Sequence, residues 1–145
     1  MKKDLVAVNP SFVIGPLLTP TPTSSLSLTL GLLTGTKRSY PNMTCGFVHI
    51  DDVVKCHILA MEDKKASGRL ICSGPVVHWS EIVKMLKSKY SKYPITDRCG
   101  SNLGYADQHS LDTSKLSELG FPAFTSIEHM FDDCIASFQE KGLLQ

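Results

Sequence analysis

Several signatures of common function classes do not occur in these 145 residues. There is no Gly-x-Gly-x-x-Gly turn and no Gly-x-x-x-x-Gly-Lys loop, so neither the dinucleotide fingerprint that opens a Rossmann fold nor a P-loop is present. The Gly-x-Ser-x-Gly elbow of many serine hydrolases is also missing. The 145 residues therefore contain neither the phosphate-binding turn of a dinucleotide or P-loop domain nor the nucleophile elbow of a serine hydrolase.

The chain also has no marked excess of positive or negative charge. The chain has 15 basic and 14 acidic residues, a net charge of +1, and no tract that would bind nucleic acid or form a charged tail. Asp4 and the Asn9-Pro10 break keep the first apolar run too short for a signal peptide, and no run approaches the roughly 20 residues of a membrane span. With 42% hydrophobic residues, the composition indicates one globular unit with a sizeable core.

The cysteines are few and scattered, and none forms a Cys-x-x-Cys pair. We therefore expect a reduced, cytoplasmic protein in which they act as small buried hydrophobes. The nearest groupings, Cys56-His57 and His129 with Cys134, lack the spacing of metal ligands, and no metal site is predicted. His57 lies on an apolar helix face and is expected to be a core histidine.

The stretch LVAVNPSFVIGP, residues 5–16, has the apolar run of a buried parallel strand, broken first at Asn9-Pro10 and again at Gly15-Pro16. Proline lacks a ladder donor and is placed at strand ends and bulges, so we expect this strand to open into a binding crevice. A proline-rich loop follows. Ser24 or Ser25 then caps a predicted helix that runs through Leu33 and stops at Gly35.

The rest of the chain alternates between strand and helix patterns. Further strands are expected at GFVHI, residues 46–50, and GRLICSG, residues 68–74. Helices are expected over 51–62, from Ser80 to Tyr90, from the cap Asp112 to Gly120, and from the capping box at 125–128 to near Gly142. The alternation predicts the α/β class, although three short strands are too few for a well-covered parallel sheet.

Two pairs of adjacent aspartates have open interpretations. Asp51-Asp52 could be a helix cap or paired carboxylates for acid/base chemistry, and capping is favoured because adjacent helical residues do not face each other. Asp132-Asp133 are expected on a solvated face. They lie opposite the apolar stripe of the last helix, which comprises Ile127, Met130, Phe131, Cys134, Ile135 and Phe138.

Several longer segments point to one family. VNPSFVIGPLL, GFVHIDDVVKCHILAME, GRLICSG, SEIVKMLKSKY, DTSKLSELGF and EKGLL occur in this order along the chain. Together they resemble the extended short-chain dehydrogenase/reductases of the plant dihydroflavonol reductase and cinnamoyl-CoA reductase branch, which includes the tetraketide α-pyrone reductases. The resemblance implies the C-terminal part of an NAD(P)-binding Rossmann-fold enzyme, mainly its substrate-binding lobe with the last strands of the sheet. Residues 1–145 would form a single incomplete unit, with the cofactor sheet and its following helix in 1–35 and the substrate-binding lobe in 36–145.

The same resemblance implies part of an NADPH site. Pro10, Ser11, Phe12 and Val13 match the segment beside the nicotinamide, and Ser25 matches a serine that contacts the cofactor. The spacing alone favours an ordinary strand end and a helix cap. No catalytic residue is assigned here, because none of the four tyrosines starts a Tyr-x-x-x-Lys motif. In the family, that motif and the glycine-rich turn precede the Asn-Pro strand.

We therefore expect part of an NADPH-dependent oxidoreductase that reduces a carbonyl or thioester of a phenylpropanoid, flavonoid or polyketide-type substrate, and that is inactive alone. Gly46 stands where dihydroflavonol reductases have a polar residue, which argues against a dihydroflavonol substrate. One alternative is a non-catalytic short isoform that associates with a full-length relative through exposed sheet edges. Another is a truncated gene model that starts at an internal methionine.

Overall fold

The computed structural model of the chain describes residues 5–100 and 108–145. Its strands are β1 (Val6–Pro10), β2 (Phe12–Ile14), β3 (Thr44–His49), β4 (Gly68–Cys72) and β5 (Val76–His78). Its helices are α1 (Ser24–Leu33), α2 (Ile50–Glu62), α3 (Trp79–Lys89), α4 (Ser114–Glu118) and α5 (Ile127–Glu140). Among the described helices, none is both long and apolar enough to cross a membrane.

The strands form two small sheets, and the chain passes from one to the other at Ser11. β1 pairs in parallel with β4, with Pro10 opposite Cys72. β2 pairs in parallel with β3, and β3 pairs antiparallel with β5 on its other edge. The predicted strand in residues 5–16 is therefore two strands that belong to different sheets, and they separate at Ser11, just after the predicted break at Asn9-Pro10.

The α/β class is confirmed, but the predicted number of strands is wrong. The structure has five described strands where the sequence pattern indicated three. β5 was not expected because its three residues follow Gly74-Pro75 and are too few to show an alternation of apolar and polar residues.

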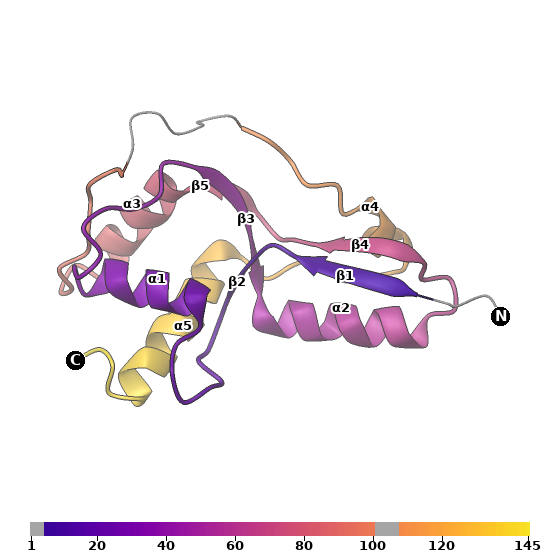
Figure 1. The fold of residues 1–145 in the computed structure, drawn as a ribbon, viewed down its shortest axis with the longest axis horizontal. Coiled ribbons are helices and arrows are strands. Elements are labelled where there is room, and N and C mark those ends of the chain that lie inside the picture. The colour runs from indigo at the N-terminus through magenta and orange to yellow at the C-terminus, as the bar shows by residue number, and fades with distance from the viewer. Residues whose placement is uncertain (1–4, 101–107) are drawn as a thin grey trace.

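An aromatic cluster fills the core between β2, β3 and their helices. Phe47 on β3 is fully buried, and its ring centroid lies 5.5 Å from that of Phe12 and 5.2 Å from that of Trp79, both edge-on. Phe131 of α5 adds a tilted contact at 5.9 Å. Such aromatic pairs contribute about 0.5–1.5 kcal/mol each beyond the burial of their area. Helices α1, α3 and α5 lie around this cluster (Figure 1).

A second core cluster forms where α2 and α4 pack on β1 and β4 (Figure 1). Val53 and Cys56 of α2 are buried against Leu70 and Cys72 of β4, and Leu116 of α4 completes the cluster. Cys134 is also fully buried, so the expectation of small buried cysteines holds for Cys56, Cys72 and Cys134 but not for Cys45 and Cys99, which are partly exposed.

The outer face of α2 does not match its predicted role. The sequence pattern placed Val54, His57, Ile58 and Met61 toward the core, but Val54 is 49% exposed, Ile58 45% and Met61 78%. His57 is also exposed, and its Nδ1 lies 2.8 Å from the carbonyl oxygen of Val53. The two-stranded sheet of β1 and β4 is narrow, and only Asp52, Val53 and Cys56 of α2 are buried.

The helices begin close to the predicted positions, but other residues cap them. α2 is capped by His49 rather than by Asp51 or Asp52, and α3 by His78 rather than at Ser80. α1 begins after Thr23, whose side chain makes no capping hydrogen bond. Gly35, with φ of +70°, follows the C-cap of α1 as predicted.

The two C-terminal helices also start near their predicted caps. Asp112 accepts a hydrogen bond from the backbone N–H of Ser114 at 3.0 Å, although Thr113 occupies the N-cap position of α4. α5 is capped by Ser126, whose hydroxyl accepts from the N–H of His129 at 3.3 Å. The N-cap is thus one residue later than the predicted Thr125, and the predicted Thr125–Glu128 capping box is wrong, because His129 and not Glu128 occupies the third helical position.

Asp52 has a structural role that neither interpretation anticipated. Its carboxylate is 1% exposed, accepts a hydrogen bond from the backbone N–H of Thr125 at 2.8 Å, and lies 3.4 Å from Lys55 Nζ. Asp51, in contrast, has a side chain that is 69% exposed. The pair is therefore neither a cap nor an acid/base couple, and Asp52 fixes the chain entering α5 against α2.

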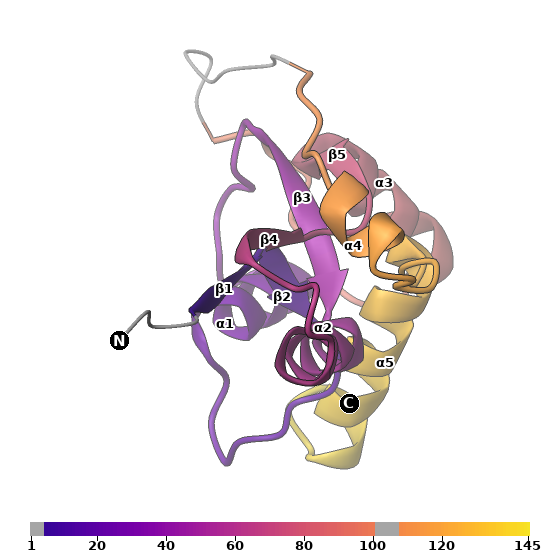
Figure 2. The ribbon, with the colours of Figure 1, turned by 90° about the vertical axis from the view of Figure 1, so that its right-hand side faces the viewer.

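Asp132 joins α5 to the end of α3, which lies on the same side of β3 (Figure 2). It accepts hydrogen bonds from Lys89 Nζ and from the Tyr90 hydroxyl, each at 2.5 Å. The side chains of Asp132 and Asp133 are 32% and 37% exposed, so the predicted solvated face is only partly exposed to water. Burial raises the pKa of Asp132, but the hydrogen bonds from Lys89 and Tyr90 outweigh it and hold that pKa below its ordinary value.

Gly46 lies where the two sheets approach each other. A Cβ atom at this position would lie 2.3 Å from Ser73 Oγ, 2.8 Å from Leu111 Cδ1 and 3.1 Å from Ser11 Cβ. The space that a side chain would occupy is therefore already filled by residues that follow β4, precede α4 and link β1 to β2.

We predict that Asp132→Asn lowers the free energy of unfolding by about 1 kcal/mol at pH 7, because the charged acceptor of two hydrogen bonds is lost. Since the folded-state pKa of Asp132 is depressed, its contribution is present above the unfolded value of 3.8 and is lost as the pH falls through the folded value. Urea unfolding at pH 7 and pH 3 measures both effects. Asp97→Asn is the matched control, because Asp97 accepts from Lys87 at 2.6 Å but is exposed; an equal loss in both variants would contradict the prediction.

We also predict that Gly46→Ala lowers the free energy of unfolding by about 1–3 kcal/mol, the range typical of overpacking. Adding Ser73→Ala removes the nearest clashing atom and should restore part of the loss. Chemical denaturation of the two single variants and the double variant measures this coupling. Strictly additive losses would show that the Ser73 hydroxyl is not the obstacle.

Candidate functional site

Two of the predicted cofactor contacts meet in one cavity. Val13 of β2 and Ser25 of α1 line a cavity of about 260 Å³ at the beginning of α1. The other lining residues come from the end of β2 and the loop after it, from α1 with its N-cap, and from the first residue of α2; they are Ile14, Gly15, Pro16, Leu18, Thr19, Thr23, Leu26 and Ile50. The cavity therefore has largely apolar walls and a polar edge at the start of α1.

The polar edge, at the start of α1, is suited to binding an anion. No acidic residue lies in the first turn of α1, and the Thr23 side chain does not cap it. The N-terminal amides of a helix and its dipole favour negative charge. Ser25, in this first turn, adds a hydroxyl at the cavity.

The other three predicted contacts lie elsewhere. Pro10 ends β1 and is exposed. Ser11 links the two sheets through its N–H, which donates to the carbonyl of Cys72 at 3.1 Å, while its hydroxyl is buried with no hydrogen-bond partner among the described residues. Phe12 packs edge-on against Phe47 and Trp79 and belongs to the core. The structure thus brings together Val13 and Ser25, and does not bring Pro10, Ser11 or Phe12 to the same cavity.

Gly15 gives the cavity its shape. Its φ is +144°, and a Cβ atom there would lie 2.7 Å from Ile50 Cγ2 and 3.1 Å from His49 Nε2. Only glycine fits such a close approach at this backbone angle.

Cys134 is hydrogen-bonded to the Gly15 backbone, but burial dominates and raises the pKa of its thiol to about 12. The thiol is therefore protonated at neutral pH and is not poised as a nucleophile.

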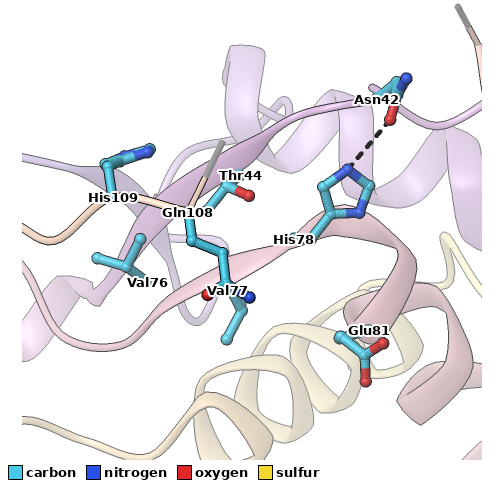
Figure 3. Close-up of a pocket in the computed structure, with 8 residues that line it drawn as sticks. All are labelled: Asn42, Thr44, Val76, Val77, His78, Glu81, Gln108 and His109. Carbon is cyan, nitrogen blue, oxygen red and sulfur yellow. Dashed lines mark hydrogen bonds between the residues drawn. The ribbon is translucent and has the colours of Figure 1, made fainter. Parts of the chain in front are cut away.

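A larger cavity of about 560 Å³ lies at the other end of the β3–β5 pair (Figure 3). Its lining residues are Asn42, Thr44, Val76, Val77, His78, Glu81, Gln108 and His109. None of the predicted site residues lies in it. His78 is held there by its Nε2, which lies 3.1 Å from Asn42 Oδ1.

Besides the two cavities, a cluster of ionisable side chains lies where β3 meets α5. His49 Nε2 is 3.3 Å from Asp133 Oδ2, without hydrogen-bond alignment, and His129 Nε2 is 3.5 Å from the same oxygen. Over the part of the chain that the structure describes, no group of three or more histidine, cysteine or acidic residues is arranged to hold a metal ion.

His49 and His78 were missed as capping residues, although the sequence carries a signal for both. The stretches FVHIDD, residues 47–52, and VVHWSE, residues 76–81, share a valine and a histidine before the helix and an acidic residue after its start. No internal repeat was expected from the sequence. The similarity becomes meaningful because both stretches end a strand and begin a helix.

Comparison with known proteins identifies relatives that match nearly the whole of this chain. No family model matches the chain. It is 58% identical over 141 residues to tetraketide alpha-pyrone reductase 2 of Arabidopsis thaliana, covering 97% of this chain and 44% of that protein. It is 37% identical over 142 residues to cinnamoyl-CoA reductase 2 of Medicago truncatula, covering 97% and 42%. The crystal structure of vestitone reductase from alfalfa (Medicago sativa L.) matches with a TM-score of 0.82 and 34% identity, covering 97% of this chain and 46% of that one.

The chain thus spans less than half the length of the curated relatives it matches, but the similarity extends over nearly all of its own residues. Its α/β arrangement matches part of a solved plant reductase. The predicted resemblance is confirmed. The chain belongs, over the portion it spans, to the plant extended short-chain dehydrogenase/reductases of the dihydroflavonol reductase and cinnamoyl-CoA reductase branch.

Proposed function

We propose that this chain forms part of an NADPH-dependent reductase that acts on a carbonyl or thioester group of a phenylpropanoid, flavonoid or polyketide-type compound. The observation that carries the proposal is the shared cavity of Val13 and Ser25 in a chain 58% identical to a tetraketide α-pyrone reductase. The family uses NADPH. Five free cysteines support the proposed cytoplasmic location.

The cavity residues fit a portion of that cofactor. The apolar walls formed by Val13, Ile14 and Leu26 suit the face of a ring, while Ser25 and the amides of the first turn of α1 suit a phosphate. At about 260 Å³, the cavity lies below the roughly 300–1,000 Å³ of pockets that enclose a whole ligand. We therefore assign a half-site to this chain. Pro10, Ser11 and Phe12 would contribute backbone and packing around it.

NADPH, when bound, supplies the hydride that reduces the carbonyl carbon. The chain's own part is to bind and orient the cofactor, and the proton must come from a group within hydrogen-bond reach of the carbonyl oxygen. Because Tyr-x-x-x-Lys does not occur in these residues, we assign the proton donor to the remainder of the longer enzyme.

The same proposal assigns each segment of the chain to a lobe of the longer enzyme. We assign residues 1–35 to the end of the cofactor sheet and its helix, and 36–145 mainly to the substrate-binding lobe. β4 pairs with β1 and α2 packs on both, so this part of the second segment belongs with the cofactor sheet.

A polyketide or cinnamoyl-type substrate is favoured over a dihydroflavonol. Gly46 offers no side-chain hydrogen bond, and Ser73 and Leu111 occupy the space beside it. A polar side chain at that position would displace both.

A second function, an interaction module, is favoured by one specific observation. The outer stripe of α2 exposes Val54, Ile58 and Met61, and β1 pairs with β4 and with no other described strand. Exposed strand edges and apolar faces attract partners. Titration with a full-length relative, followed by size-exclusion chromatography, separates the functions, because a module forms a stoichiometric complex.

We predict that the purified 145-residue chain oxidises no NADPH in the presence of an aromatic aldehyde or a tetraketide pyrone. We also predict that excess NADPH leaves its melting temperature unchanged, because a half-site binds too weakly to stabilise the folded state. Absorbance at the NADPH band and a thermal melt measure the two outcomes. Measurable turnover by this chain alone would refute the proposed division of the active site.

We further predict that Ser25→Ala raises the KM for NADPH by about tenfold, the loss expected for a hydrogen bond to a charged group, with little change in kcat. The assay uses this chain joined to the preceding portion of the Arabidopsis reductase named above. Ser27→Ala is the matched control, since that hydroxyl lies in the same helix but donates to the carbonyl of Pro22 at 3.1 Å. Equal effects of the two variants would exclude Ser25 from the cofactor site.

A further inference from the structure

Two helices of this chain start with the same uncommon cap. His49 ends β3 and caps α2, and His78 ends β5 and caps α3. Their backbone angles are nearly equal, with φ of −71° and ψ of 143° at His49, and φ of −78° and ψ of 144° at His78. In each case the ring Nδ1 accepts the N–H of the second residue after it, Asp51 or Ser80, at 3.1 Å.

This geometry requires a neutral imidazole. Serine, threonine, aspartate and asparagine are the preferred N-caps because their oxygens accept at any neutral pH. A histidine accepts only while the capping nitrogen carries no proton, and imidazole is the side chain that changes charge between about pH 5 and 8. Protonation would therefore replace the acceptor by a donor and place a positive charge at the positive end of the helix.

The two caps differ in the groups that face them. The side chain of His49 is 3% exposed and is flanked by Asp51 Oδ2 at 3.8 Å and Asp133 Oδ2 at 3.3 Å, with the His129 ring stacked at 6.2 Å. Two carboxylates thus lie close to the His49 ring at the start of α2.

Among the described residues, no carboxylate forms an ion pair with the His78 ring. Its Nε2 lies 3.1 Å from Asn42 Oδ1, and its Nδ1 lies 2.8 Å from Ser80 Oγ. Glu81 and His109 are the ionisable groups that line the same cavity (Figure 3). If Nδ1 took up a proton, the Ser80 hydroxyl would accept it in a hydrogen bond, and the Ser80 N–H would lose its partner.

The residue next to His78 connects the cap to the core. The N–H of Trp79 donates to the carbonyl of Met43 at 3.1 Å, and its indole packs edge-on against Phe12 and Phe47. Trp79 is 1% exposed and is the single tryptophan of the sequence. Opening the first turn of α3 would therefore loosen the aromatic cluster and change the emission of this one indole.

We propose that His78 is a proton-sensitive latch on α3. When its imidazole takes up a proton, the Ser80 N–H loses its acceptor, the first turn of α3 opens and Trp79 loosens from the aromatic cluster. The device depends on the geometry of the fold and not on the proposed reductase activity.

Tryptophan fluorescence and amide hydrogen exchange of the 145-residue chain between pH 8 and pH 5 test the latch. We expect a red shift of Trp79 emission and, after correction for the intrinsic pH dependence, at least about a fivefold rise in exchange at the Ser80 amide, the factor that corresponds to losing an N-cap. His78→Asn keeps a good cap that does not titrate, so this variant should lose the transition. His49→Asn should retain it.

Several results would overturn the latch. They are a transition that persists in His78→Asn, a transition that disappears in His49→Asn alone, and Trp79 emission that is already that of an exposed indole at pH 8. The ¹⁵N chemical shifts of the His78 ring in the unmodified chain at pH 8 provide a test that does not depend on any variant. We expect an unprotonated Nδ1, and a protonated Nδ1 would contradict the proposal.

Discussion

The edge-to-face packing of Phe12, Phe47 and Trp79 is the interaction on which the rest of this structure depends. These three rings come from β2, β3 and the first residue of α3, so one cluster sets the register of the second sheet and the start of a helix. Rings that meet at about 5 Å in this orientation leave little freedom for the backbones that carry them. The cavity beside Val13 and the cap at His78 both lie within one or two residues of the cluster.

The passage of the chain from one sheet to the other at Ser11 explains why the candidate site looks incomplete. β1 hydrogen-bonds with β4, and two residues later β2 hydrogen-bonds with β3, so the predicted cofactor segment is divided between two sheets. Val13 reaches the cavity at α1, while Phe12 is used by the core. A short segment with alternating faces cannot present all of its side chains to one ligand.

Buried and half-buried polar side chains join the elements to one another. Asp52 receives the chain entering α5, Asp132 receives the end of α3, and the two histidines close the starts of α2 and α3. Each accepts at least one hydrogen bond, and a buried acceptor or donor that lost its partner would be costly. The small size of the two sheets makes these ties important, because neither apolar cluster alone spans all of the helices.

Local patterns predicted what depends on local sequence. The α/β class, the positions of the helices to within a few residues, the apolar stripe of α5 and the family motifs were all readable, because capping, periodicity and turn residues act over three or four positions. The assignment of the predicted strand in residues 5–16 to two different sheets, β5, the exposure of Val54, Ile58 and Met61, and the buried role of Asp52 were not. Each of these depends on which distant segment lies alongside, and Asp52 meets Thr125 across 73 positions. The sequence by itself determined the helices, the α/β class and the family. The tertiary structure decided how the strands pair and which faces are buried, because both depend on long-range partners that no short pattern encodes.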